Sequence, residues 1–88
     1  MIERTVTITA AQGMHARPAG LLVKQAAALP TPVTLTKVGG GSTPANSILG
    51  ILSLQIAQGD QVVLVAEGDD AAAAVDQLAE LLETGLGE

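Results

Sequence analysis

Residues 12–20, Gln-Gly-Met-His-Ala-Arg-Pro-Ala-Gly, constrain the fold more than any other stretch, because two kinds of periodicity meet there. The residues before them alternate between apolar and polar, as a strand does. Those after them, up to Leu29, repeat with helical spacing. Pro18 suits the first turn of a helix, where backbone N–H groups have no intrahelical acceptor. The stretch therefore predicts a strand, a loop, and a helix that begins at about Ala16.

The only histidine of the chain, His15, falls at the predicted start of that helix. Free N–H donors and the positive end of the helix dipole favour an anion at such a place. They disfavour a cation, so the imidazole ring would stay neutral and nucleophilic. A phosphoryl group on this ring would also meet the Arg17 guanidinium. One interpretation of His15 is thus a phosphoryl acceptor, and the other is an ordinary capping or partly buried histidine.

Composition narrows the chemistry further. With one histidine and no cysteine, the chain lacks the usual ligands of a zinc site and the partners of a Cys–His pair, so no metal or cofactor is expected. A Ser–His–Asp triad is compatible with the composition, but nothing in the sequence places such residues together. The glycine run at residues 39–41 lacks the Gly-Lys-Ser/Thr ending of a phosphate loop, and a turn is expected there.

Length and charge indicate the class of protein. Eighty-eight residues without Phe, Trp or Tyr predict one small domain, residues 1–88, with a core of Val, Ile, Leu and Ala. The net charge of −5 and the missing aromatic platforms argue against nucleic-acid binding. Residues 1–5 do not resemble a signal peptide, and no apolar run approaches the length of a membrane span. With no cysteine to form a disulfide, a cytoplasmic protein without membrane insertion is expected.

Charge is unevenly spread along the chain. All four basic residues lie within the first 37 positions, and eight of the nine acidic residues lie between positions 60 and 88. A solvated helix face is the simpler explanation of the acidic end. The functional alternative is that the face near His15 is kept less negative so that an acidic partner can dock there.

The remaining periodicities predict strands at residues 2–8, 33–37, 40–44 and 61–66, and helices at about 16–29, just after 47 and at 70–84. Arg4 interrupts the apolar face of the first strand and is therefore expected at a sheet edge. Asn46 or Ser47 is the expected N-cap of the short helix. Asp69 and Asp70 are expected to serve as capping and dipole residues of the last helix rather than as a metal or acid–base pair. Gly85 is its expected C-cap. This order predicts an α+β open sandwich.

Two stretches resemble a known family. The first is Gly13-Met14-His15-Ala16-Arg17-Pro18-Ala19-Gly20, which resembles the active-site signature of HPr, the histidine-containing phosphocarrier family of the bacterial sugar phosphotransferase system. The second is Ser47-Ile48-Leu49-Gly50-Ile51-Leu52-Ser53-Leu54, which resembles the signature around the family's regulatory serine. The ending at residues 85–88 also fits. Two separated motifs in the right order are more specific than one, and they favour the phosphoryl-acceptor interpretation of His15.

The resemblance implies an α+β open-faced sandwich, βαββαβα, in which three helices cover one face of a four-stranded antiparallel sheet. It implies a phosphoryl carrier rather than a stand-alone enzyme. His15 would accept the group from phospho-enzyme I and pass it to a sugar-specific enzyme IIA, with no cofactor. The alternative is a regulatory interaction module, a nitrogen- or carbon-regulation relative of HPr whose phosphorylation state controls partner binding. A small-molecule-binding domain without phosphate chemistry has no supporting pocket pattern.

The resemblance also assigns roles to residues around His15. Arg17 and the backbone N–H of Ala16 would stabilise the phosphoryl group. Gly13 and Pro18 would hold the geometry of the loop and helix, and Gly20 would let a partner approach closely. Partner docking is expected, on motif position, to involve Ile48, Leu49, Leu52 and Lys24.

Ser47 aligns with the regulatory serine, so a serine kinase or phosphorylase is a further expected partner. The family often has lysine just before this serine, whereas Asn46 stands here, and the loop is one residue longer than in typical members. An N-cap role alone would explain Ser47 equally well. A monomer is expected.

Overall fold

The computed structural model describes residues 1–9, 13, 14 and 16–84. The strands are β1 (Ile2–Thr7), β2 (Thr34–Lys37), β3 (Ser42–Pro44) and β4 (Gln61–Ala66). The helices are α1 (Ala16–Ala28), α2 (Ile48–Ser53) and α3 (Ala71–Glu83). The predicted βαββαβα order is confirmed, and each predicted element is present within a few residues of its expected bounds. Gly85, the expected C-cap of α3, lies outside the described residues.

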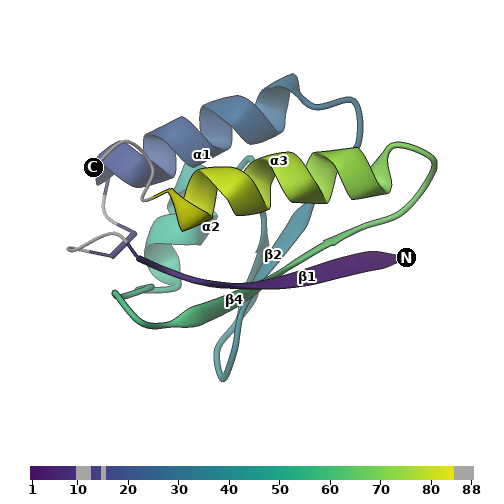
Figure 1. The fold of residues 1–88 in the computed structure, drawn as a ribbon. Coiled ribbons are helices and arrows are strands. Elements are labelled where there is room, and N and C mark those ends of the chain that lie inside the picture. Colours follow the sequence, from purple (N-terminus) through teal and green to yellow (C-terminus); the bar gives the residue numbers. More distant parts are fainter. Residues whose placement is uncertain (10–12, 15, 85–88) are drawn as a thin grey trace.

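The four strands form one antiparallel sheet in the order β1-β4-β2-β3. The three helices lie on one face of this sheet and leave the other face open (Figure 1). The sheet explains the continuous apolar run of β4, because this strand lies between two others. Val62, Leu64 and Ala66 are buried under the helices, while Val63 and Val65 are half-buried on the open face. The predicted open-faced sandwich is therefore confirmed.

The core contains aliphatic side chains from every layer, as the composition predicted. Its largest fully buried members include Ile8, Leu22, Leu35, Ile51, Leu64 and Leu78. The predicted apolar stripe of α3 is buried throughout and gains Ala74; it comprises Ala71, Val75, Leu78, Ala79 and Leu82. Burial of one face of α3 follows directly from its periodicity, whereas the continuous apolar run of β4 is fully buried only on the face under the helices.

Arg4 interrupts the apolar face of β1, and the sheet order explains why. As expected, β1 is an edge strand, so a charged side chain on it can reach beyond the core. The Arg4 guanidinium donates to Asp76 Oδ1 at 3.2 Å and to Glu83 Oε1 at 2.8 Å. These contacts join β1 to the acidic side of α3.

The beginning of α3 differs from expectation. Asp70 occupies the N-cap position, but its side chain makes no capping hydrogen bond, because its backbone has φ −94° and ψ 5° rather than the extended geometry usual at an N-cap. Asp70 therefore occupies the predicted capping position but does not make the hydrogen bond of an N-cap. What remains is negative charge near a helix N-terminus. Separately, none of the helices in the described part of the chain has the length and apolar character that a bilayer crossing requires.

Candidate functional site

The beginning of α1 is the place at which the sequence predicts the site. His15 lies outside the described residues, so the site is built from the residues on either side of it. Ala16 is the first residue of α1, as predicted, and both Ala16 and Arg17 are exposed. The first turn contains no acidic residue. The free N–H groups and the Arg17 guanidinium thus make this helix end electropositive.

Pro18 and Ala19 are buried, in contrast to the two residues before them. Pro18 is among the largest fully buried side chains of the protein. The first turn of α1 is therefore anchored in the core by one side while Arg17 faces solvent on the other. Proline suits this turn because its missing N–H removes no intrahelical hydrogen bond.

Gly13 and Met14 fix the chain just before position 15. Gly13 has φ +68°, and a Cβ atom there would lie 2.7 Å from the Cα of Ala57, against the backbone of the segment that follows α2. The Met14 N–H donates to the Ile56 carbonyl oxygen at 2.8 Å, and the Met14 side chain is buried. Only glycine combines this left-handed conformation with so close an approach.

One face of α1 extends the site along the helix. Arg17, Leu21 and Lys24 are four and then three residues apart, which places them in one stripe along the helix. All three are exposed, and Leu21 retains 40% of its accessible surface. Gly20, next to this stripe, is half-buried, and a Cβ atom there would meet no protein atom within 4 Å. The face is therefore basic at two points, apolar between them, and open.

The short helix α2 packs against α1 (Figure 1). Its N-cap is Ser47 rather than Asn46, because the Ser47 Oγ accepts a hydrogen bond from the Gly50 N–H at 3.1 Å. Leu49 is 77% exposed and Ile48 is 39% exposed, whereas Leu52 is half-buried and packs against the core. Of the three residues predicted for docking on α2, Leu49 is thus the most accessible and Leu52 is partly structural.

Sequence reasoning missed the contribution of Leu21, although its helical spacing between Arg17 and Lys24 could have revealed it. It also missed Lys37 of β2 and Asp60, the last residue of the segment between α2 and β4 that contacts Gly13. The Lys37 Nζ donates to the carbonyl oxygens of Leu54 and Gln55, each at 3.2 Å, and lies 3.5 Å from the Asp60 Oδ2.

The Asp60 carboxylate also accepts the Ala57 N–H at 2.9 Å. This backbone hydrogen bond is the main reason that the pKa of Asp60 is lowered from its ordinary value of 3.8, and the positive charge of Lys37 adds to the effect against the opposing cost of burial. Asp60 is therefore held as a carboxylate at neutral pH.

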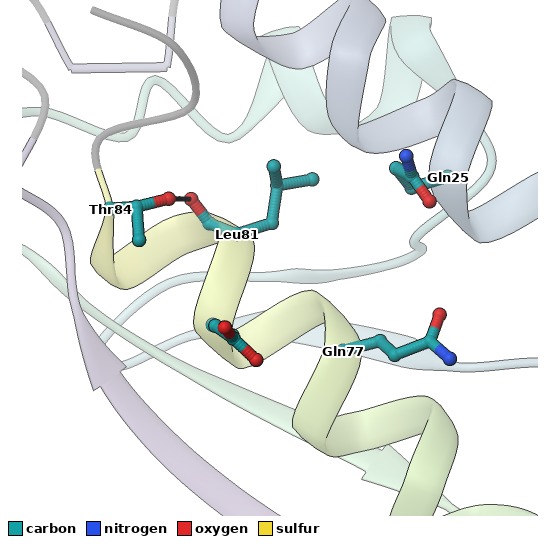
Figure 2. A pocket seen from close by; sticks show the side chains of 5 residues that line it. Gln25, Gln77, Leu81 and Thr84 are labelled. Atoms are coloured by element: carbon teal, nitrogen blue, oxygen red, sulfur yellow. Dashed lines mark hydrogen bonds between the residues drawn. The ribbon is translucent and has the colours of Figure 1, made fainter.

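A groove of about 280 Å³ lies between α1 and α3, away from the predicted site residues. Figure 2 shows Gln25 on one side and Gln77 on the other, with the Thr84 hydroxyl donating to the Leu81 carbonyl oxygen at 2.9 Å. Glu80 completes the lining. Among the described residues, Ala16, Arg17, Lys24, Ile48, Leu49 and Leu52 line no part of this groove. Ala16, Arg17, Lys24 and Leu49 are exposed instead, which suits contact with a protein more than enclosure of a small molecule.

Comparison with known proteins identifies relatives of the whole chain. The family model described as the PTS HPr component phosphorylation site matches residues 2–84. The phosphocarrier protein HPr of Streptomyces coelicolor is 41% identical over 88 residues, which cover all of this chain and 95% of that protein.

Two solved structures come from Thermoanaerobacter tengcongensis and are each 41% identical to this chain. HPr-C-His covers 100% of this chain and 98% of its own, with a TM-score of 0.91. An HPr dimer covers 100% of both chains, with a TM-score of 0.74.

Proposed function

The chain belongs to the HPr family of phosphotransferase-system phosphocarriers, and from this membership we propose its donor, its acceptor and its carrier residue. His15 takes the phosphoryl group from phospho-enzyme I and gives it to a sugar-specific enzyme IIA. Like its relatives, the protein is a carrier and not a stand-alone enzyme. The observation that carries the proposal is the exposed beginning of α1, where Ala16 and Arg17 directly follow position 15.

Phosphoryl transfer between two histidines requires few groups beyond those at the beginning of α1. An unprotonated ring nitrogen of His15 attacks the phosphorus, the donor's N–P bond breaks, and its electron pair returns to the donor nitrogen. In the transition state the charge of the phosphoryl group is spread over its three equatorial oxygens. The Ala16 N–H and the Arg17 guanidinium are the groups proposed to stabilise that charge and the phosphohistidine that follows. Because an imidazole nitrogen is both the nucleophile and the leaving group, an N–P bond forms as a similar one breaks, and the step is readily reversible, as a carrier requires.

The docking surface proposed for both partners consists of Arg17, Leu21, Lys24, Ile48 and Leu49. Two positive charges flank exposed apolar side chains, and neither α1 nor α2 contains an acidic residue. Of the acidic residues of α3, Asp76 and Glu83 contact Arg4, and Glu80 lines the groove between α1 and α3. An acidic partner surface with an apolar centre complements this arrangement and would be steered to it.

Ser47 is proposed as a secondary, regulatory phosphorylation site for a serine kinase and phosphorylase. Its hydroxyl already caps α2, next to the exposed Ile48 and Leu49. A phosphate there would place negative charge in the docking surface and repel an acidic partner. Mass spectrometry after incubation with ATP and a cognate kinase tests this role. If the protein gains no phosphate, the regulatory role is removed and Ser47 serves only as the N-cap of α2.

A monomer in the cytoplasm is the proposed working state. The solved dimer is that of the Thermoanaerobacter tengcongensis protein. Size-exclusion chromatography with light scattering over a range of concentrations decides the state for this chain.

The test of function is phosphoryl transfer from phosphoenolpyruvate with purified enzyme I. Wild type and Arg17→Lys should acquire acid-labile, base-stable phosphate, the variant more slowly because lysine lacks the planar fork of arginine. His15→Ala should acquire none. Addition of a cognate enzyme IIA should then discharge the labelled wild type. Phosphate on His15→Ala, or none on wild type with a cognate enzyme I, contradicts the proposal.

A further inference from the structure

The segment at residues 54–60, which joins α2 to β4, holds both ends of the loop that carries position 15. At the β1 end, the Ile8 N–H donates to the Asp60 carbonyl oxygen at 2.8 Å, and the Gly59 N–H donates to the Ile8 carbonyl oxygen at 2.9 Å. At the α1 end, the Met14 N–H donates to the Ile56 carbonyl oxygen at 2.8 Å. The start of α1 is therefore placed relative to this segment.

The segment in turn is shaped by Asp60 and Lys37. The Asp60 carboxylate accepts the Ala57 N–H, and the Asp60 N–H donates to the Ala57 carbonyl oxygen at 3.0 Å, which closes a tight turn. Lys37 ties the beginning of the segment, at the Leu54 and Gln55 carbonyls, to the Asp60 carboxylate at its end. Both side chains are partly shielded, with 24% of Lys37 and 35% of Asp60 exposed.

Gly13 lies so close to this turn that a change in the shape of the turn would move Gly13. Gly13 contacts the Ile56 carbonyl and the Ala57 Cα so tightly that no Cβ fits between them. Ala57 is also the residue whose N–H the Asp60 carboxylate holds. A change in the turn at Ala57 therefore displaces the backbone two residues before position 15, rather than being absorbed in a gap.

We propose that Asp60, acting with Lys37 through the Ile56–Ala57 backbone, is a positioning residue for phosphoryl transfer at His15. The inference rests on the proposed function of His15 and adds a residue 45 positions away in the sequence. Its physical basis is that in-line transfer depends on the alignment of the reacting atoms, so a small displacement of the loop lowers the rate without removing any group that touches the phosphate.

The test compares Asp60→Ala, Asp60→Asn and Asp76→Asn at a temperature at which circular dichroism finds each fully folded. Asp76 is the matched control, because it also forms an ion pair, with Arg4, but lies on α3 and outside the chain of contacts described above. Rates of phosphoryl transfer from phospho-enzyme I are measured against protein concentration. Asp60→Ala should lower the maximal rate about tenfold with little change in KM.

Asp60→Asn retains an oxygen that can accept the Ala57 N–H, so it should recover part of the rate. Asp76→Asn should stay within about twofold of wild type. Amide NMR gives the readout that a general loss of stability would not move: the Met14 N–H signal should shift in Asp60→Ala and not in Asp76→Asn.

Two results overturn the inference while leaving the function of His15 intact. One is a folded Asp60→Ala protein that transfers at the wild-type rate, and the other is an equal slowing by Asp76→Asn. A wild-type protein that accepts no phosphate contradicts the proposed function itself and the inference with it. A rise in KM alone would assign Asp60 to partner binding and would equally overturn a positioning role.

Discussion

Gly50 of α2 lies directly over Thr43 of β3, so close that a Cβ atom at position 50 would overlap the threonine hydroxyl. The Thr43 side chain is itself buried and donates to the Pro44 carbonyl oxygen at 3.2 Å. The contact sets how closely α2, which carries the exposed Leu49, can approach the sheet. A glycine in the middle of a short helix, which is unfavourable for the helix alone, is explained by this packing.

Gly50→Ala should therefore destabilise the protein, although alanine favours helix by about 0.5–1 kcal/mol. Overlap with the Thr43 hydroxyl and Cβ costs about 1–3 kcal/mol when the core cannot open. We expect a net decrease in the free energy of unfolding, and a Tm lower by several degrees in thermal unfolding followed by circular dichroism. In a Thr43→Ala background the nearest atom is gone, so the loss should shrink. A rise in Tm on Gly50→Ala alone would show that α2 can move away freely.

Gly20→Ala should have the opposite effect. Gly20 lies inside α1, and a Cβ atom there would meet nothing within 4 Å. Alanine should thus stabilise the protein by about 0.5–1 kcal/mol through helix propensity and the reduced entropy of the unfolded chain. Urea unfolding measures this change. The same variant tests whether a partner approaches closely here, since the added methyl group should then raise the KM for phospho-enzyme I; an unchanged KM would remove that role.

Gly13→Ala should be costly for two reasons that a second glycine separates. The left-handed conformation at φ +68° costs a residue with a Cβ about 1–2 kcal/mol, and overlap with the backbone of Ile56 and Ala57 adds to it. Gly39 has φ +81° but open space around its Cβ direction. Urea unfolding should show a larger loss for Gly13→Ala than for Gly39→Ala, by about 1 kcal/mol or more. Equal losses would mean that the contact with Ile56 and Ala57 is loose.

The sequence predicted those features of the fold that depend on local periodicity and on single turns. The apolar stripe of α3, the continuous run of β4 and the proline at the start of α1 each have one favourable structure. Asn46 and Ser47 could not be told apart, because both are good N-caps and only the local backbone geometry decides between them. Asp70 illustrates the same limit, since its position was right and its hydrogen bond was not.

The support beneath the site could not be read from the sequence, because it depends on strand register. Lys37 is 23 residues from Asp60, and their approach follows from the pairing of Lys37 with Val62 in the β2–β4 ladder. Likewise, Arg4 meets Asp76 and Glu83 only because β1 is the edge strand beside α3. The motif located the chemistry, whereas the contacts that hold the motif in place come from distant segments.

Asp60 should make stability depend on pH in acid. Its pKa is lowered from 3.8 by the Ala57 hydrogen bond and then by Lys37, so the folded protein binds this proton more weakly than the unfolded chain does. The contribution of the carboxylate is therefore fully present above the unfolded pKa, and it is lost as the pH falls through the folded pKa. The difference in Tm between wild type and Asp60→Asn should be constant from about pH 7 to about pH 5 and should shrink below about pH 4. Thermal unfolding across this range measures it, and a difference that persists undiminished to about pH 2.5 would place its origin outside the carboxylate charge.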